Sequence, residues 1–574
     1  MTTRCNVEYG AGIKEQKNPK SFAMTHLYKK NAASARRLVF TTILILSGLA
    51  QLPGQLSGTY TIGGFKPDYS TINAAVSDLN WQGISGPVTF MIRPGYYTEQ
   101  VTLRKVRGTS MSRVITFQSE SRNAGDTRIQ FYPEADDNNY VVRFDGAYNY
   151  KIKNITLENL SASRGRVVHV INTAENLQIE SCRLYAAHFV STYDEQSILH
   201  FTPSGSRNIM IKNNSISGGG NGMFISGSNT GTHTGTVITG NSISRYYYMG
   251  VVVRNLQGGR FTNNKILGVS QVPDSPIALT IANWNGTPLS PVLVANNFVS
   301  VQYGNQWGFA LSNSNHIQVF NNSINQATDQ TVLSLSNVQN VAVLNNILRA
   351  GRGLAVRAYN AVNLNMNYND LITRGQILGS WNWRSAYTFT KWQLLSGKDS
   401  RSLNVDPEFV ADYDLHAKAV ALIGAGVAIP NVTSDIDGES RSNPPCIGAD
   451  EFKLAIKFPW WYPMYSAKST EPNAAATGND ADAKQEGIGI SVREHAVFPT
   501  PAFDRLNVAI TDAYAGSVTL SVLDGLGRKV SEFSYEKDGP DLRTEITVSD
   551  LVPGVYLLRI EEGKEVTVKR FVKR

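Results

Sequence analysis

Aromatic residues in the central part of the chain are the side chains whose type and spacing best suit binding. A tyrosine or tryptophan ring can stack on the apolar face of a sugar. If the fold brings these rings to one side, we expect a strip that binds a few sugar units. The candidate residues are Tyr246, Tyr247, Tyr248, Trp284 and Trp307. The alternative is that these rings pack loops against the body of the protein, because large aromatic side chains are readily buried.

The titratable residues of the same region form no recognisable catalytic set. His188, Asp194, Glu195 and His200 fall in one insertion, and Asp274 falls in another. A polysaccharide lyase needs an arginine or lysine base, usually with calcium held by several carboxylates, and a glycoside hydrolase needs paired carboxylates. Asp194 and Glu195 are adjacent, so on a strand they would face opposite ways. We therefore assign no catalytic residue and expect solvated loop charges here.

The metal-ligating residue types also lack a recognisable spacing. Asp435 and Asp437 resemble part of a calcium loop, but the downstream glutamate of an EF-hand is missing. Cys5, Cys182 and Cys446 match no Cys/His zinc pattern. The sequence therefore predicts no metal site and no cofactor, and a calcium ion is expected only if the chain is a lyase.

A repeat provides the elements that must position these residues. Segments such as KNNSI, FNNSI and LNNIL place an asparagine every 23 to 33 residues, with an aliphatic residue two positions later. Apolar residues alternate before each asparagine, which predicts a strand. One short strand, an asparagine turn and further strands make one coil of a solenoid. The repeated asparagines are Asn214, Asn241, Asn264, Asn297, Asn322, Asn346 and Asn369.

The regular phase of this asparagine ladder favours a structural role over a binding role. An asparagine amide at a corner can bond the backbone of its own turn and the amide of the next coil. A solenoid also needs covered ends. Residues 70–79 carry apolar Ile72, Ala75, Val76 and Leu79 at helical spacing behind Ser70, which predicts a helix capped by Ser70 over the N-terminal end.

Two stretches of the chain are similar to a known superfamily. The segment GTYTIGGFKPDYSTINAAVSDLNWQGISGPVTFMIRPGYYTEQ and the closing segments 406–410, 435–438 and 447–452 resemble pectin-lyase-like proteins of Bacteroidetes. The resemblance covers roughly residues 58–452. It implies an all-β fold, a right-handed parallel β-helix with an N-terminal capping helix. It implies no activity, because the superfamily holds lyases, hydrolases, esterases and adhesins.

The positive charge of the chain belongs mostly to its N-terminus. The net charge is +8, but residues 1–37 hold eight Lys and Arg against two Glu, which leaves 46 basic and 44 acidic residues elsewhere. A nucleic-acid partner is therefore not expected. Residues 1–50 are predicted to be a leader and signal peptide, with the apolar run at 38–50. That run is too short to span a membrane, so we predict no transmembrane span in the mature protein.

The C-terminal part of the chain is predicted to be separate from the β-helix. Residues 453–486 read as an end cover, including the aromatic run 458–465, followed by a small and polar linker. Residues 487–574 carry short strands, which predicts a small β-sandwich. The pieces VFPTP, VLDGLGRK and LVPGVYL and the basic end are similar to the type A C-terminal sorting domain of type IX secretion, although Thr500 replaces the usual asparagine. The resemblance implies the type IX machinery as partner.

The sequence thus predicts an exported β-helix protein that is secreted or attached to the outer-membrane surface. We expect it to bind glycan or extracellular material, and a near-zero net charge after the leader favours neutral or weakly acidic oligosaccharides. The alternative is a polysaccharide lyase or glycoside hydrolase on the same scaffold. Three or more carboxylates beside an arginine or lysine would favour the enzyme, whereas an aromatic surface without them would favour binding.

Overall fold

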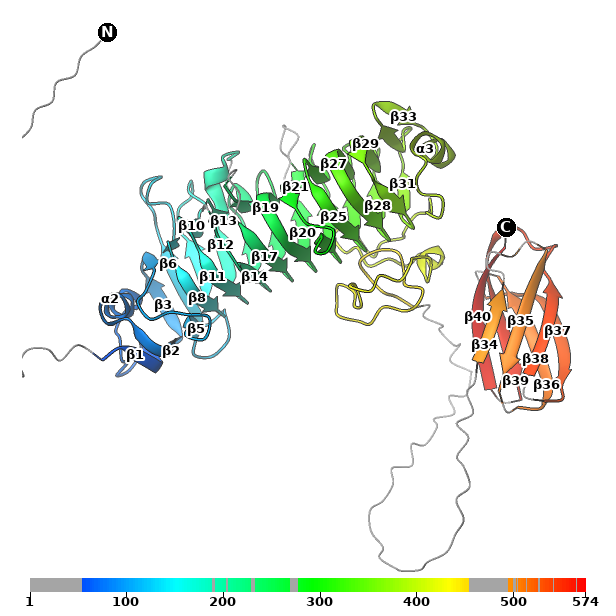
Figure 1. The fold of residues 1–574 in the computed structure, drawn as a ribbon, viewed down its shortest axis with the longest axis horizontal. Coiled ribbons are helices and arrows are strands. Elements are labelled where there is room, and N and C mark those ends of the chain that lie inside the picture. Colours follow the sequence, from blue (N-terminus) through cyan, green and yellow to red (C-terminus); the bar gives the residue numbers. More distant parts are fainter. Residues whose placement is uncertain are drawn as a thin grey trace, which may run out of the picture. The chain divides into compact units, whose positions relative to one another are not determined.

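The structure is a computed structural model, and it describes most of the chain outside the leader and the linker (Figure 1). The described residues are 54–187, 191–202, 205–228, 233–268, 277–453 and, with short gaps, 494–573. The predicted leader, the aromatic run 458–465, the linker 466–486, His188 and Asp274 lie outside them. None of the described helices is both long and apolar enough to cross a membrane.

Residues 56–386 wind into parallel coils, and each coil contributes strands to three faces. Face 1 contains β4 (Val101–Arg104), β7 (Val142–Asp145), β10 (Val168–Ile171), β13 (Ser197–Phe201), β16 (Asn221–Ser226), the start of β19 (Val251–Thr262), β21 (Ile277–Asn285), β24 (Trp307–Ser312), the start of β27 (Leu333–Leu344), β29 (Val356–Val362) and β32 (Gly379–Trp381). Face 2 contains β1 (Leu56–Ile62), β2 (Ile84–Ile92), β5 (Ile115–Ser119), β8 (Tyr148–Lys153), β11 (Glu175–Glu180), β14 (Met210–Lys212), β17 (Thr234–Thr239), the ends of β19 and β27, β22 (Val292–Ala295), β25 (Asn315–Phe320) and β30 (Asn365–Asn367).

Face 3 is a separate sheet of 11 strands, one for each coil. Its strands are β3 (Gly95–Thr98), β6 (Thr127–Phe131), β9 (Thr156–Asn159), β12 (Arg183–Ala186), β15 (Ser215–Ser217), β18 (Ser242–Ser244), β20 (Lys265–Gly268), β23 (Phe298–Val301), β26 (Ser323–Gln326), β28 (Ile347–Ala350) and β31 (Asp370–Thr373). Because β19 and β27 continue through the corner between faces 1 and 2, those two faces join into one sheet of 22 strands. The predicted all-β parallel β-helix is confirmed.

Rows of stacked aliphatic side chains fill the interior. Alternate residues of each strand point inward, and the parallel register places them above one another. Burying one such side chain stabilises the fold by about 1.5–3 kcal/mol. One row on face 2 consists of Ile179, Ile211, Ile238, Phe261, Val294, Val319 and Val343.

The asparagine ladder lies at the corner between faces 2 and 3, and every member is buried. The Asn322 amide illustrates the pattern: its Nδ2 donates to Asn346 Oδ1 (2.9 Å) and Val294 O (3.0 Å). Its Oδ1 accepts from both the backbone N–H (3.1 Å) and Nδ2 (2.8 Å) of Asn297. Each corner thus satisfies backbone groups of its own coil and of the neighbouring coils.

Short helices lie at both ends of the coils (Figure 1). At the N-terminal end, α2 (Ile72–Gln82) buries the four apolar residues that the sequence indicated. Its cap is Thr71 rather than the predicted Ser70, because Thr71 Oγ1 accepts from the Ala74 N–H at 3.0 Å. At the other end, β33 (Arg384–Ala386) pairs with β32 as a hairpin and α3 (Phe389–Ser396) follows. The ladder ends there, since Asn369 Nδ2 donates to Asp399 Oδ1 at 3.0 Å.

After α3 the chain turns back along the corner that holds the ladder, and we call residues 403–453 the strap. The strap contains the short 3₁₀ helix η2 (Val420–Leu422), and η1 (Asp194–Gln196) lies in an earlier loop. The residue before a ladder asparagine is often a second, outward-facing asparagine with positive φ, as in Asn263, Asn296 and Asn345. These side chains hold the strap by donating to Asp435 O (3.0 Å), Ser434 O (2.7 Å) and Val427 O (2.8 Å), respectively.

The C-terminal domain consists, in its described residues, of two antiparallel sheets. One contains β34 (Glu494–Phe498), β35 (Arg505–Thr511) and β38 (Asp541–Thr547). The other contains β36 (Gly516–Leu523), β37 (Lys529–Lys537), β39 (Gly554–Glu562) and β40 (Glu565–Lys573). Buried residues of both sheets, such as Leu506, Ile546, Leu520 and Ile560, form one hydrophobic cluster.

Candidate functional site

Two of the five aromatic residues proposed to face a glycan are buried instead. Tyr246 and Trp284 are both 0% exposed. Trp284 Nε1 donates to Gly258 O at 2.6 Å, and the Tyr246 hydroxyl donates to Gln306 Oε1 at 3.3 Å. These side chains are packed and hydrogen-bonded inside the protein, so they offer no ring face to a ligand. For them the packing alternative is correct.

The other three predicted residues are partly buried and do not form one strip. Tyr247 and Tyr248 lie in the turn after β18, where their N–H groups donate to Gly219 O (3.1 Å) and Gly220 O (2.7 Å). Trp307 begins β24 on face 1 and is partly exposed. Its Nε1 is buried and has no hydrogen-bond acceptor among the described residues. All three keep some exposed surface, and Trp307 is the one that lies on a strand of face 1.

Trp307 belongs to a cluster of aromatic side chains around an arginine at the C-terminal end of face 1. We call Trp307, Arg357, Tyr359 and Trp383 the platform. The Arg357 guanidinium lies 4.6 Å from the Trp383 ring centre and 5.8 Å from that of Trp307. The Tyr359 and Trp383 rings are 4.9 Å apart. Trp383 is 64% exposed and Tyr359 is 38% exposed, so two ring surfaces face solvent beside one cation.

Trp383 stands at a position that its side chain disfavours. It forms, with Asn382, the two-residue turn of the β32–β33 hairpin, and their φ values are 46° for Asn382 and 68° for Trp383. Such turns favour Gly and Asn, and a bulky residue with positive φ is an outlier that costs roughly 1–3 kcal/mol. Strained residues of this kind cluster at functional sites. Packing does not explain it, because most of the ring is exposed.

The charge of Arg357 is not neutralised within the described part of the chain. None of the described residues forms an ion pair with its guanidinium, whose contacts are the two tryptophan rings. Its neighbours in the same outward row are Ser334 on β27 and Ser380 on β32. An arginine held between rings keeps its planar fork of N–H donors, which suits a carboxylate.

A second group of polar side chains lies at the other end of the same outward row. The row runs by strand register through Arg143, His169, His200 and Phe224, and reaches Arg357 five coils later. The His169 and His200 rings meet edge to face at 5.5 Å, and His200 stacks on Phe224 at 5.1 Å.

Burial keeps both histidines of this row neutral near pH 7. It lowers the pKa of His200 to about 4, with the Arg166 charge adding to the effect. It lowers the pKa of His169 to about 2, again helped by Arg166. Of the two adjacent loop carboxylates, Glu195 is exposed as expected, whereas Asp194 is less solvated than the sequence suggested. Asp194 is half-buried, its carbonyl accepts from His200 Nδ1 at 2.8 Å, and burial raises the pKa of its carboxyl.

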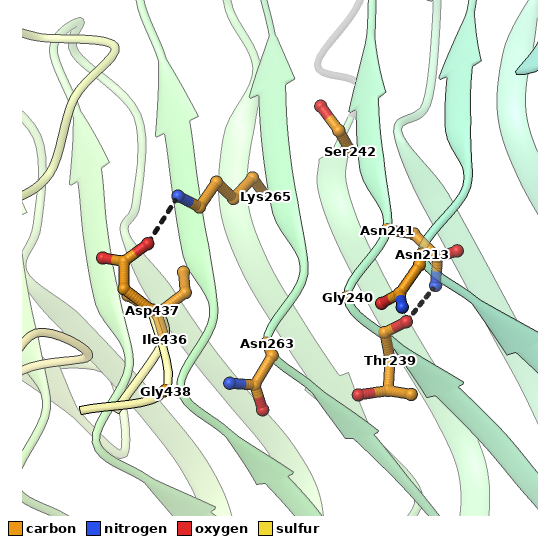
Figure 2. A pocket seen from close by; sticks show the side chains of 10 residues that line it. All are labelled: Asn213, Thr239, Gly240, Asn241, Ser242, Asn263, Lys265, Ile436, Asp437 and Gly438. Carbon is orange, nitrogen blue, oxygen red and sulfur yellow. Dashed lines mark hydrogen bonds and ion pairs between the residues drawn. The ribbon is translucent and has the colours of Figure 1, made fainter. Parts of the chain in front are cut away.

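A cavity of about 400 Å³ lies where the strap meets the corner of the coils (Figure 2). Its walls are the corner residues of three coils, including Asn213, Gly240 and Asn263, and the strap residues Asp437 and Gly438. Lys265 on β20 reaches across to Asp437, with its Nζ 3.3 Å from Oδ1. Most of the residues that line the cavity have polar side chains, and none of them is a tryptophan or tyrosine.

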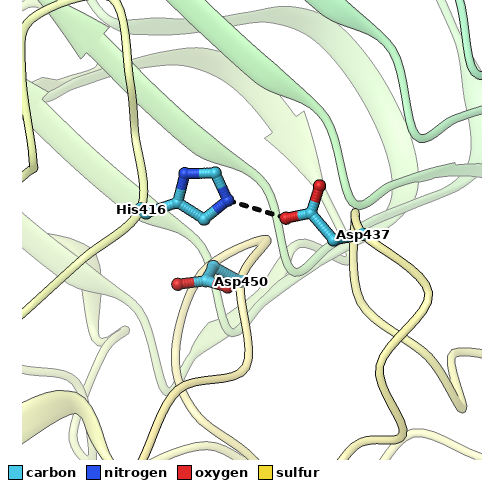
Figure 3. Close-up of side chains that lie close together, drawn as sticks. All are labelled: His416, Asp437 and Asp450. Carbon is cyan, nitrogen blue, oxygen red and sulfur yellow. Dashed lines mark hydrogen bonds and ion pairs between the residues drawn. The ribbon is translucent and has the colours of Figure 1, made fainter. Parts of the chain in front are cut away.

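Beside this cavity, three strap residues bring their ligand atoms together (Figure 3). One nitrogen or oxygen atom of each of His416, Asp437 and Asp450 lies within 4.8 Å of the others. His416 Nε2 is 2.7 Å from Asp437 Oδ2, and His416 Nδ1 hydrogen-bonds Asp414. We call His416, Asp437 and Asp450 the strap cluster. The sequence missed it because His416 and Asp450 lie on either side of the Asp435–Asp437 loop and only the fold brings them together.

The environment of the strap cluster shifts the pKa of all three residues. Burial opposes the charged form of His416, but its hydrogen bonds to Asp437 and Asp414 outweigh this and raise its pKa. Burial also acts on Asp437, but the hydrogen bond from His416 and the charge of Lys265 lower its pKa. Burial raises the pKa of Asp450 to about 6, and repulsion from Asp435 and Asp437 adds to it.

Comparison with known protein families identifies the C-terminal domain. Residues 496–574 match the family described as "Secretion system C-terminal sorting domain". This segment is a sorting domain. The chain is therefore a β-helix protein with a type IX sorting tail, secreted or attached to the cell surface. No curated protein matches the chain in sequence.

Several solved structures are similar to the β-helix. A variant of the periplasmic alginate epimerase AlgG is 12% identical, with 60% of this chain and 76% of that chain covered and a TM-score of 0.36. The Dettilon tailspike protein is 10% identical, with 87% and 90% covered and a TM-score of 0.39. The pectin methylesterase from Aspergillus niger is 13% identical, with 63% and 95% covered and a TM-score of 0.24. At such low values, none of these similarities bears on the activity of this chain.

Proposed function

We propose that this secreted β-helix protein binds glycan at the platform on face 1. The observation that carries the proposal is Trp383, an exposed ring kept at a strained turn position beside a second exposed ring and an unpaired arginine. Pyranose rings have apolar faces that stack on aromatic side chains. The proposal retains Trp307 from the sequence prediction and adds Tyr359 and Trp383. It leaves out Tyr246, Tyr247, Tyr248 and Trp284.

The chemistry of the platform favours a weakly acidic glycan. Stacking on Trp383 and Tyr359 would supply apolar burial, and Arg357 would donate a paired hydrogen bond to a carboxylate on the sugar. Trp307 on β24 and the β32–β33 turn are three coil steps apart, which corresponds to roughly 14 Å at the usual strand spacing. That span suits an oligosaccharide of a few units, with a uronic acid next to Arg357.

A glycan array with the full chain tests this proposal. We expect binding to oligosaccharides that contain uronic acids. Arg357→Gln should weaken the acidic ligands more than the neutral ones, because it removes the cation and leaves the rings. Arg207→Gln is the matched control, since Arg207 is an exposed arginine that already pairs with Glu175 at 3.0 Å. No binding by the wild type, or equal binding by Arg357→Gln, would contradict the proposal.

The enzyme alternative is supported by one observation. Asp414, Asp437 and Asp450 gather beside Lys265, which is the composition that a lyase requires. The arrangement is less suitable than the composition, because Lys265 is held by Asp437 and lies over the Phe298 ring at 5.3 Å. New unsaturated or reducing ends after incubation with an array ligand, lost in Lys265→Met, would establish the enzyme instead.

A further inference from the structure

From the geometry of the strap cluster we infer that His416, Asp437 and Asp450 bind a divalent transition-metal cation of the Zn²⁺ type. Zinc accepts imidazole nitrogen and carboxylate oxygen at about 2.0–2.2 Å, so its ligand atoms lie roughly 3 Å apart. His416 Nε2 and Asp437 Oδ2 are already 2.7 Å apart. The Asp450 carboxylate lies within 4.8 Å of both. Three protein ligands with space for water form a common zinc arrangement.

The surroundings of His416 are those of a metal-ligating histidine. Such a histidine usually donates its second ring nitrogen to a carboxylate, which fixes the tautomer and the ring orientation. Asp414 hydrogen-bonds His416 Nδ1, which directs Nε2 toward Asp437 and Asp450. The edge of the imidazole also packs against Phe298, with ring centres 5.1 Å apart. The ring is therefore fixed before any cation arrives.

Asp450 provides a second, independent observation. The residue is only 9% exposed, and none of the described residues donates a hydrogen bond to its carboxylate. A buried carboxylate without a partner is costly, and such groups are normally paired or bound to a metal. The nearby Asp435 differs, because its oxygens accept the N–H groups of Asp437 (3.0 Å), Glu439 (2.8 Å) and Glu451 (3.0 Å). Asp435 shapes the loop, whereas no described residue donates to the Asp450 carboxylate.

His416 lies between two carboxylates, with Asp414 at its Nδ1 and Asp437 at its Nε2. Lys265 Nζ is 3.3 Å from Asp437 Oδ1. This pairing leaves Asp437 Oδ2 on the His416 side. The three ligands come from three separate segments of the strap. A bound cation would therefore tie these segments together against β20.

Titration of the metal-free full chain with ZnCl₂ tests the inference. After treatment with a chelator, we expect binding by calorimetry and a rise in Tm that grows with Zn²⁺ concentration. Asp450→Asn should abolish both effects. In the chelator this variant should melt at or above the wild-type Tm, because it removes an unpaired buried charge, so loss of binding cannot be attributed to misfolding. His416→Gln should also lose the Zn²⁺ response.

Glu439→Gln is the matched control, because it removes an exposed carboxylate from the same loop and should respond as the wild type does. Co²⁺ provides a second readout, since a site with one nitrogen and several oxygens gives a visible absorption band that Asp450→Asn should remove. No Zn²⁺-dependent rise in wild-type Tm would overturn the inference. So would an equal rise in Asp450→Asn, which would place the cation elsewhere, for example at the buried His495, Asp512 and Glu562.

Discussion

A single asparagine of the ladder connects three coils. The Asn322 amide bonds Val294 O in the preceding coil and Phe320 O in its own, and Asn346 Oδ1 in the next coil receives both its Nδ2 and its backbone N–H. All of these groups are buried, so water cannot replace a lost partner. The cost of a substitution should therefore arise from the unpaired groups that remain rather than from lost packing.

Asn322→Leu should lower the free energy of unfolding by about 1–3 kcal/mol for the backbone groups that lose their partner. Glycan binding should not change, because the ladder lies at the corner away from the outer surface of face 1. Urea denaturation of the full chain measures the effect. Asn337→Gly is the control: Asn337 is exposed, so water can replace its amide bonds with Asn313 (3.2 Å) and Asn360 (3.0 Å), and glycine suits its positive φ. Its change should stay within about 0.5 kcal/mol. An unchanged midpoint for Asn322→Leu would show that the ladder is not structural.

The residue scale also shows where the sequence was informative. The ladder repeats with the coil, so its period alone identified all seven asparagines. Trp383 belongs to no repeat in the sequence. It lies in a hairpin at the end of the coils, and its only signal was the segment WNWR just before a helix. Trp284 was misassigned because an aromatic residue at a coil corner has the same sequence context whether its ring turns in or out.

At the scale of elements, the outward row of face 1 contains two histidines, His200 buried and His169 partly buried. His169 and His200 lie on neighbouring strands β10 and β13, and burial depresses their pKa values below the 6.5 expected in an unfolded chain. As the pH falls, such a histidine is protonated at a higher pH in the unfolded state than in the folded state. Stability is therefore retained above about pH 6.5 and lost as the pH falls toward the folded pKa.

Through His200 alone, the free energy of unfolding should be about 2 kcal/mol lower at pH 5 than at pH 8. In His200→Gln that part of the pH dependence should disappear, so the difference between denaturation midpoints at pH 8 and pH 5 should shrink. The comparison requires urea titrations of both proteins at the two pH values. The same pH dependence in both proteins would mean that His200 is not buried in its neutral form.

The sorting domain has its own buried element, a network of charges around Lys537. This side chain is 0% exposed, and its Nζ donates to Asp512 Oδ1 (2.6 Å), Asp512 O (3.1 Å) and Tyr514 O (2.8 Å). Glu562 and His495 complete the network, with 2.9 Å between His495 Nε2 and Glu562 Oε2. Burial opposes ionisation of Asp512, but the hydrogen bond from Lys537 outweighs it and lowers the pKa of Asp512 to about 2.

Lys537→Met should destabilise the sorting domain by about 3–5 kcal/mol, because it leaves buried carboxylates without their cation. Thermal unfolding of the full chain should show an early transition for this domain. Lys529→Met removes an exposed lysine paired with Glu532 and should change stability by less than about 1 kcal/mol. Equal transitions in the two variants would show that the network contributes nothing.

The sequence predicted the strands and helices better than the contacts between distant segments. Alternating apolar residues located the coils, and helical spacing located α2 with all four of its buried residues. The strap was assigned only as closing motifs, since its path depends on the outward asparagines such as Asn296 and Asn345, which have no partner within their own coil. Contacts between distant segments leave no local period, so the strap cluster could not be predicted.

At the scale of the whole molecule, the proposed binding sites and the sorting domain belong to different parts of the chain. The platform and the strap cluster lie within residues 265–450, and the sorting domain matches residues 496–574. Deletion of residues 487–574 should therefore leave the β-helix folded while the protein accumulates in the periplasm. Cell fractionation and circular dichroism measure the two outcomes. Surface delivery of the truncated chain would contradict the assignment of sorting to this domain.

The central claim is that an exposed, strained tryptophan on face 1 binds a sugar ring. Calorimetric titration of the strongest array ligand into wild type, Trp383→Gly and Tyr96→Ala tests it most directly. Glycine suits the positive φ of this turn, so Trp383→Gly should be at least as stable as the wild type. Tyr96→Ala removes an equally exposed ring from face 3 and should bind normally. The account predicts a loss of about tenfold or more in affinity for Trp383→Gly alone. A Kd for Trp383→Gly equal to that of the wild type would contradict it.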